Sequence, residues 1–222
     1  IKNFKELATT KNREMVLEII GSGLDAINTE KVINSSVSLI GDILFIKEKE
    51  FDLTKFNKVK VVAFGKSSPE AALALERILG SKIGEGVVIG LHKFPSEFME
   101  TFIGTHPKPS EANVVATKKI MEMIENSNEN DLIIVLVTGG GSSLLCSLEG
   151  ELEQGIRLYD SFLGTGKIGI ELNTIRKHIS LLKGGGLAKL AYPATIIGLI
   201  FSDVPGDHFE YVASGPTYKD DT

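Results

Sequence analysis

Hydrophobic positions follow a repeating pattern from residue 58 onward. Short runs rich in valine and isoleucine alternate with longer segments whose apolar residues have helical spacing. The predicted strands are KVKVVAFG, EGVVIG, DLIIVLV and ATIIGLIFSD. The segments predicted as a turn and helix are SSPEAALALERILG and HPKPSEANVVATKKIMEMIE. Strands that alternate with helices predict an α/β fold with a Rossmann-like, mostly parallel sheet and helices on both faces.

The first 57 residues lack this alternation and have helical spacing instead. The apolar face of residues 12–28 and its continuation in 29–40 comprise Met15, Ile19, Ile20, Leu24, Ile27, Val32, Ser36 and Leu39. We expect two N-terminal helices that pack against the α/β part. Because no repeat or Gly/Pro-rich linker divides the chain, we expect one domain over residues 1–222, helical over 1–57 and α/β over 58–222.

Composition narrows the classes of partner. The hydrophobic content of 42% is ordinary for a soluble globular protein, and a net charge of −5 disfavours nucleic acid as a partner. The apolar runs are far shorter than the roughly 20 residues of a membrane span, and the N-terminus has no signal-peptide core. The single cysteine, Cys146, fits a reducing compartment. We therefore expect a cytoplasmic protein without a membrane partner.

The stretch AFGKSSPEA places Lys66 and Ser67 between a predicted strand and a capped helix. A lysine at this place can reach an anion bound at the helix N-terminus, where free N–H groups favour negative charge. The stretch is not a Walker A loop, because Lys60 occupies the position of its first glycine. An exposed loop lysine is the alternative interpretation.

The stretch VTGGGSSLL places three glycines and two serines after a strand that is predicted to be buried. Gly139, Gly140 and Gly141 could form a nest of N–H groups around a phosphate or carboxylate, and Ser142 and Ser143 could add hydroxyl groups. A dinucleotide fingerprint is not met, because its last glycine would fall on a leucine. Three adjacent glycines cost backbone entropy, which favours close approach of a ligand over a plain tight turn.

The last predicted strand leads into two carboxylates, Asp203 and Asp207. Carboxylates at a strand end commonly hold Mg²⁺ or accept a proton from a substrate hydroxyl. Capping of the loop is the alternative role for both residues.

A basic segment precedes that strand, since residues 172–202 contain no acidic residue. Asn173 and Arg176 share one face of a predicted helix, and Lys183 extends it. Such a face could bind a carboxylate or phosphate, although an exposed helix face is the alternative. His106, which precedes a proline, is typical of a turn residue.

Together these motifs resemble the type II glycerate kinases, or glycerate 2-kinases. The matching stretches lie in order over roughly residues 60–222: AFGKSS, GTHPKPSEAN, VTGGGSSLL, LNTIRKHISLLKGGGLA, FSDVPGD and ASGPTYKDDT. Members of this family use ATP and Mg²⁺ to phosphorylate the 2-hydroxyl of D-glycerate, giving 2-phosphoglycerate. They have a larger Rossmann-like domain and a smaller C-terminal domain that closes the cleft between them.

The resemblance implies roles for the residues singled out above. Lys66, Asp203 and Arg176 would be catalytic, with Lys66 stabilising charge on the transferred phosphoryl group. Asp203 and Asp207 would serve the metal. Substrate or phosphate would be held by Gly139, Gly140, Gly141, Ser142, Ser143, Asn173, Lys183, Ser67 and His106.

The chain departs from the family in length, because the smaller C-terminal domain and the arginine that it contributes are absent from residues 1–222. We therefore expect this polypeptide to be weakly active or inactive without that domain or a second chain. Two alternatives stay open, namely a kinase of another small hydroxy acid and a non-catalytic nucleotide- or anion-binding module. The resemblance is also compatible with a homodimer.

Overall fold

The centre of the molecule is a five-stranded parallel sheet. The computed structural model describes residues 1–164 and 169–222. The strands are β4 (Lys58–Phe64), β5 (Ile83–Gly90), β6 (Glu100–Ile103), β7 (Asp131–Val137) and β8 (Thr195–Ile200). Their spatial order is β6-β5-β4-β7-β8, so the chain first adds strands on one side of β4 and then on the other. The carboxyl ends of β4 and β7 therefore flank a topological switch point, the place where doubly wound sheets bind ligands.

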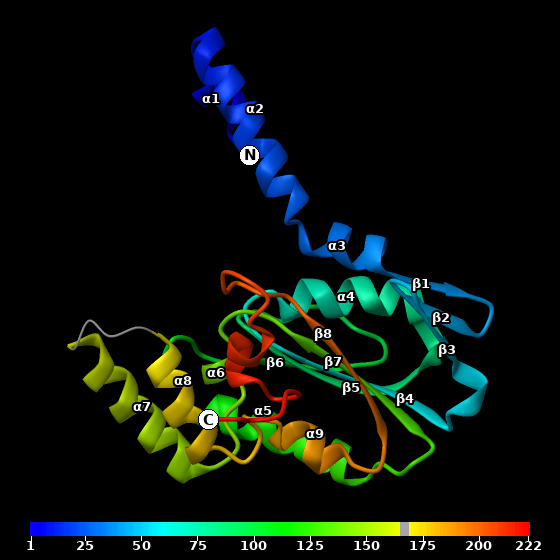
Figure 1. Cartoon of the computed structure of the whole chain (residues 1–222). Coiled ribbons are helices and arrows are strands. Elements are labelled where there is room, and N and C mark those ends of the chain that lie inside the picture. The colour runs from blue at the N-terminus through cyan, green and yellow to red at the C-terminus, as the bar shows by residue number, and fades with distance from the viewer. Residues whose placement is uncertain (165–168) are drawn as a thin grey trace.

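Helices cover both faces of this sheet, as the sequence predicted (Figure 1). Helix α4 (Ser68–Leu79) packs on one face, and α5 (Glu111–Glu125) and α9 (Gly186–Ala191) pack on the other. Strand β7 is buried along its whole length because it lies between these two hydrophobic cores. The predicted α/β class with a parallel sheet is confirmed.

The described part of the segment between β7 and β8 carries three further α-helices in addition to α9. These are α6 (Gly141–Leu144), α7 (Glu149–Leu163) and α8 (Gly169–Ile179), and α7 packs beside α8 (Figure 1). The short 3₁₀ helix η3 (Phe209–Ser214) contacts both α6 and α8. Two further 3₁₀ turns are η1 (Leu53–Lys55) and η2 (Gly80–Lys82).

The prediction that residues 1–57 are helical is wrong for their second half. After α1 (Phe4–Leu7), α2 (Lys11–Ala26) and α3 (Thr29–Ser36), the chain forms an antiparallel sheet of β1 (Val37–Ile40), β2 (Ile43–Ile46) and β3 (Lys49–Asp52). A turn at Gly41, with φ +60°, reverses the chain between β1 and β2. Strands of four residues are too short for periodicity to separate from a continuing helix.

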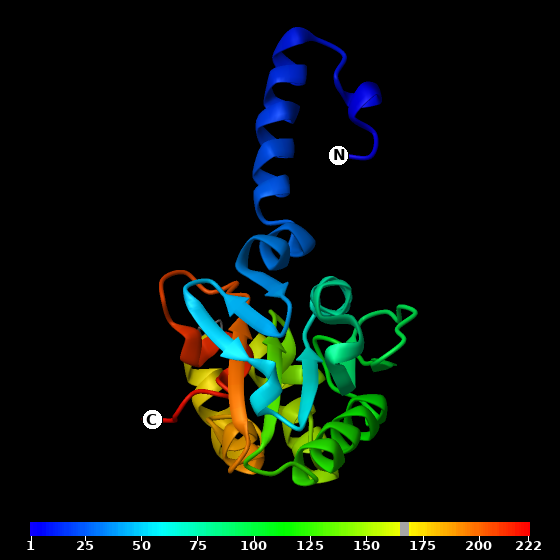
Figure 2. The same cartoon turned by 90° about the vertical axis from the view of Figure 1, so that its right-hand side faces the viewer.

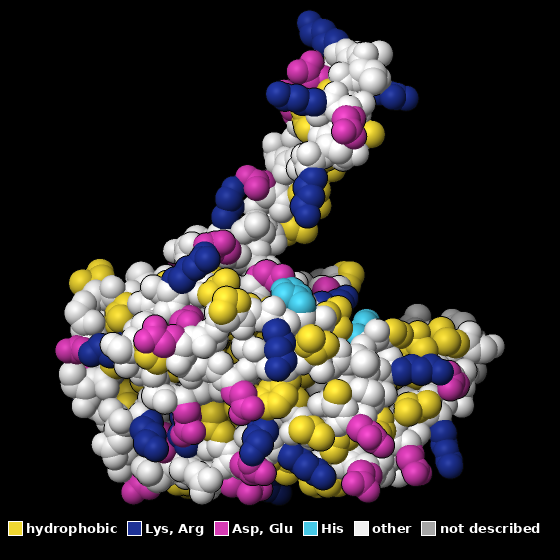
Figure 3. All heavy atoms as spheres, turned by 180° about the vertical axis from the view of Figure 1, so that it is seen from behind, with side chains coloured by type: hydrophobic (Ala, Val, Ile, Leu, Met, Phe, Trp, Pro, Cys, Tyr) yellow, Lys and Arg dark blue, Asp and Glu magenta, His cyan; other side chains and the backbone are white. Residues whose placement is uncertain are grey.

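Helix α3 packs against α4 as predicted, with Ile33 buried in the core, but α2 does not pack against the body. Helix α2 contains no buried residue and projects from the body of the molecule (Figures 1 and 2). Ile19 is 67% exposed and Ile27, just after the helix, is 72% exposed. Figure 3 shows hydrophobic side chains along this projection, among charged side chains of both signs. No helix within the described residues is long and apolar enough to cross a membrane.

Candidate functional site

The loops after β4 and β7 are joined directly by backbone hydrogen bonds. The N–H of Lys66 donates to the Gly139 carbonyl at 2.8 Å, and the N–H of Thr138 donates to the Phe64 carbonyl at 3.1 Å. The N–H of Ser67 donates to Thr138 Oγ1 at 3.2 Å. Two stretches singled out from the sequence therefore lie side by side at the switch point of the sheet.

Gly65 permits this close contact. Its φ is +129°, and a Cβ atom there would lie 2.0 Å from Thr138 Oγ1 and 2.5 Å from the Thr138 carbonyl oxygen. The following turn is held by Ser68 Oγ, which donates to the carbonyls of Gly65 and Ile89. Any other residue at position 65 would separate the loops.

Two of the three glycines of the β7 loop, Gly139 and Gly140, let candidate functional side chains approach the backbone. A Cβ atom at Gly139 would lie 1.9 Å from Asp203 Oδ2. A Cβ atom at Gly140 would lie 3.0 Å from both His106 Cδ2 and Lys66 Cγ, and its φ is +85°. The glycines thus make room for an acid, a histidine and a lysine that come from three different strand ends.

The cluster carries mixed charge. Lys66 Nζ lies 3.8 Å from Asp203 Oδ2, and both side chains are about half exposed. Burial lowers the pKa of His106, the positive charges of Lys66 and Arg176 lower it further, and Asp203 opposes them. These effects favour the neutral form of the His106 ring. Burial also lowers the pKa of Arg176, whose guanidinium has no hydrogen-bond or ion-pair partner among the described residues.

A buried asparagine that the sequence interpretation missed positions His106. Asn113 is completely buried, and its Oδ1 accepts from the N–H of Thr105 at 2.8 Å. Its Nδ2 donates to the carbonyls of Thr105 and Ser143, at 2.9 and 2.8 Å. One side chain thus ties the histidine loop to helix α6. A polar residue on the apolar face of α5 was the only signal for it in the sequence.

Comparison with known proteins assigns the chain to a family. The family described as "Domain of unknown function (DUF4147)" matches residues 15–222. The chain belongs to this family. A glycerate 2-kinase from Pyrococcus horikoshii is 37% identical over 95% of the chain.

Two solved structures agree with the fold of this DUF4147 domain. A protein from Pyrococcus horikoshii superposes with a TM-score of 0.82 at 35% identity over 96% of the chain and 49% of its own. A glycerate kinase from Thermotoga maritima gives a TM-score of 0.78 at 32% identity over 93% of the chain and 48% of its own. The chain spans about half the length of the curated relatives it matches, 48% in both of the first two. The resemblance to glycerate 2-kinases is confirmed.

Two predicted ligand-binding residues of the DUF4147 domain are engaged with protein groups. Lys183 is buried, and its Nζ donates to the Leu145 carbonyl at 2.7 Å and forms an ion pair with Glu151. Asn173 Nδ2 donates to the Tyr211 carbonyl at 3.1 Å. We therefore no longer expect Lys183 to contact a ligand, because its ammonium is already satisfied inside the protein.

Asp207 does not contact the cluster formed by Lys66, His106 and Asp203. It is exposed, and no hydrogen bond or ion pair among the described residues joins it to Asp203 or Lys66. The same part of the chain contains no group of three or more His, Cys, Asp or Glu side chains that could hold a metal ion. A complete protein-made metal cage is therefore not present in this part of the chain.

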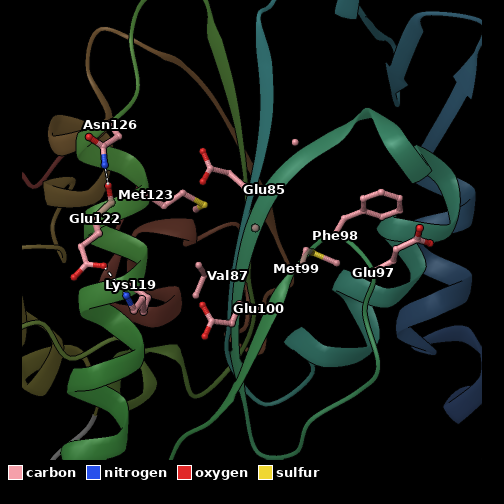
Figure 4. A pocket seen from close by; sticks show the side chains of 12 residues that line it. Glu85, Val87, Glu97, Phe98, Met99, Glu100, Lys119, Glu122, Met123 and Asn126 are labelled. Atoms are coloured by element: carbon pink, nitrogen blue, oxygen red, sulfur yellow. Dashed lines mark hydrogen bonds and ion pairs between the residues drawn. The ribbon is translucent and has the colours of Figure 1, made fainter.

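A hollow of about 590 Å³ lies at the opposite, amino-terminal side of the sheet, between α5, β5 and β6 (Figure 4). Glu85 and Glu100 point toward α5 in this hollow, whereas Glu97 points away (Figure 4). Glu85 is paired with the buried Lys60 at 3.0 Å, and Glu122 is paired with Lys119 at 2.9 Å. None of the residues predicted to be functional lines this hollow, so the switch-point cluster is the candidate site.

Proposed function

We propose that this chain takes part in the ATP-dependent phosphorylation of D-glycerate to 2-phosphoglycerate. The observation that carries the proposal is the convergence of Lys66, His106, Arg176 and Asp203 on a glycine loop at the switch point. The glycerate 2-kinase names of similar proteins support the same substrate.

Phosphoryl transfer demands positioned positive charge and N–H donors more than covalent chemistry, because negative charge spreads over the oxygens of the transferred group. Lys66 and Arg176 supply the charges. The backbone N–H groups of Gly139 and Gly140 have no hydrogen-bond partner among the described residues and can donate to an oxyanion. In this proposal Asp203, which lies beside Lys66, accepts the proton of the substrate hydroxyl or holds the metal.

The donor set also fits Mg²⁺. Magnesium usually binds one or two carboxylates and completes its shell with water and substrate phosphate, so a protein cage is not required. Asp203 offers one half-exposed carboxylate at the end of β8, and Asp207 lies in the loop that follows. The ion would neutralise phosphate charge there.

We propose that a further domain or second chain completes the cleft, because the curated relatives are about twice as long as the part that matches. The single cysteine, Cys146, is a free and buried thiol, which fits the proposed reducing cytoplasmic setting. A homodimer remains part of this proposal and is tested by the mass of the protein in solution.

The test is a coupled kinase assay that measures ADP formation from ATP in the presence of D-glycerate. It is carried out on the full polypeptide that the gene encodes and on residues 1–222 alone. Phosphorus NMR of the product distinguishes 2- from 3-phosphoglycerate. Lys66→Ala should lower kcat by about 10²-fold or more, because a charge that stabilises the transition state is lost. Leu163→Ala, an exposed position at the end of α7, is the control.

Three results would contradict the proposal in different ways. Full turnover by residues 1–222 alone would remove the need for a further domain. Faster turnover of another hydroxy acid would change the substrate. If calorimetry shows that the full polypeptide binds ATP but the assay detects no product, the protein is a nucleotide-binding module and not a kinase.

A further inference from the structure

A chain of hydrogen bonds runs from η3 to the glycine loop. Asn173 Nδ2 donates to the Tyr211 carbonyl at 3.1 Å. Ser214 Oγ donates to Asn173 Oδ1 at 2.9 Å, and Ser142 Oγ lies 2.8 Å from Ser214 Oγ. The chain thus links three segments that are far apart in the sequence and ends at a serine beside Gly141.

The direction of every bond in this chain follows from its first member. The Tyr211 carbonyl can only accept, so the Asn173 atom facing it is the amide nitrogen, and the amide oxygen faces Ser214. The single hydroxyl hydrogen of Ser214 is therefore used on Asn173. Consequently Ser142 must donate its own hydrogen to Ser214, and only its lone pairs are available on the other side.

Ser142 also lines a small cavity together with Arg176. The volume of this cavity is about 20 Å³, which holds one water molecule or one hydroxyl group and nothing larger. Apolar wall atoms come from Pro109 and Ile179. Glu151 and Lys183 also line it, but they are paired with each other. Arg176 is thus a donor without a partner in the described part of the chain, and Ser142 is an acceptor.

We propose that this cavity is the subsite for the substrate hydroxyl that is not phosphorylated, an inference that rests on the proposed glycerate kinase function. A hydroxyl can donate to Ser142 Oγ and accept from Arg176 at the same time. A carboxylate or phosphate oxygen only accepts, so it would face the lone pairs of Ser142. In D-glycerate the group that fits is the 3-hydroxyl, and its insertion leaves the 2-hydroxyl free to react.

The experiment compares D-glycerate with D-lactate, which has hydrogen in place of the 3-hydroxyl, on the full polypeptide. The measured quantities are kcat/KM for each substrate, or the competitive inhibition constant of lactate where it is not phosphorylated. Ser142→Ala should lower kcat/KM for glycerate by about 10- to 100-fold, because the buried hydroxyl of the substrate loses its acceptor. The value for lactate should change less than about threefold, so discrimination between the two falls.

Two further variants keep the test decisive. Ser142→Gly should give the same loss of discrimination if the alanine variant is poorly folded, as judged by thermal unfolding. Ser161→Ala, on the exposed face of α7, should leave kcat/KM unchanged for both substrates. An equal loss for glycerate and lactate in the Ser142 variants would overturn the hydroxyl subsite and leave the proposed function intact. Absence of glycerate phosphorylation by the wild-type polypeptide would overturn the proposed function, and the subsite would fall with it.

Discussion

Glu151 and Lys183 form an ion pair that is almost completely enclosed, with side chains only 5% and 2% exposed. The second oxygen of Glu151 accepts from the N–H and Oγ of Ser147, at 2.8 and 2.6 Å. Lys183 also donates to the Leu145 carbonyl. The pair therefore holds α7, the chain that follows the glycine loop, and the segment before α9 together.

Loss of the Glu151 charge should destabilise the fold. Glu151→Gln leaves the Lys183 ammonium buried without a counter-charge, which costs about 3–5 kcal/mol in the free energy of unfolding. Urea titration followed by circular dichroism measures this cost. The matched control is Asp160→Asn, which breaks a half-exposed pair with Lys108 and should cost at most about 1 kcal/mol. Equal effects of the two variants would contradict a structural role for the buried pair.

The same pair predicts how stability depends on pH. Burial raises the pKa of Glu151, but the charge of Lys183 and hydrogen bonds from Lys183 and Ser147 outweigh it and hold the pKa below the ordinary value of 4.5. A lowered pKa in the folded state gives stability that is present above the unfolded value and lost as pH falls through the folded value. Melting temperatures should therefore drop more steeply below pH 4.5 in the wild type than in Glu151→Gln. Parallel curves would be inconsistent with this assignment.

The sequence predicted the elements of the sheet that carry strong periodicity, including β4, α4, α5, β7 and β8. In β4, α4, α5 and β7 the apolar positions correspond to buried residues, whereas β8 has no fully buried residue and was predicted from its run of apolar, β-branched residues. It did not predict the antiparallel strands of residues 37–52, because four-residue strands contain barely one period of any pattern. The sequence also did not show that α2 projects from the body. An apolar stripe indicates that one helix face is suited to a hydrophobic contact, but it does not identify the surface that makes this contact.

The convergence of Lys66, Gly139 and Asp203 could be predicted because all three follow parallel strands, whose carboxyl ends share one edge of the sheet. The hydrogen-bond and ion-pair partners of Lys183 and Asn173 could not be predicted in this way. Glu151 and Tyr211 lie 32 and 38 positions away from them, and nothing in local spacing reports a buried contact of that kind. Some of the basic and amide side chains that suggested ligand binding are therefore engaged in hydrogen bonds and ion pairs within the protein.

The pKa of His106 should report the charges around the glycine loop. Burial and the charges of Lys66 and Arg176 lower this pKa, and Asp203 raises it. Lys66→Met should therefore raise the pKa, and Asp203→Asn should lower it further. The measurement is an NMR titration of the histidine ring protons, with His178→Gln used to help assign the signals. Shifts of the opposite sign would show that the cluster is arranged differently in solution.

Two glycines should respond to alanine in opposite directions. At Gly65 the positive φ alone costs about 1–3 kcal/mol for another residue, and the Thr138 carbonyl blocks the new methyl group. At Gly21, within α2, a Cβ atom would meet nothing within 4 Å, so Gly21→Ala should stabilise that helix by about 0.5–1 kcal/mol. Global unfolding reports the first change and local helix content by circular dichroism reports the second. Unchanged stability of Gly65→Ala would mean that the β4 and β7 loops are not in contact.

Helix α2 should exchange its amide hydrogens much faster than the sheet. A helix of 16 residues with glycine at positions 21 and 23 is marginal by itself, and no residue of α2 is buried to stabilise it. Strand β7, by contrast, is buried along its length and should open only when the whole domain unfolds. Hydrogen exchange with mass spectrometry compares peptides from the two elements at several protein concentrations. Slow exchange of α2 at every concentration would contradict the exposed helix, and protection that grows with concentration would show that its apolar face associates with another copy of the chain.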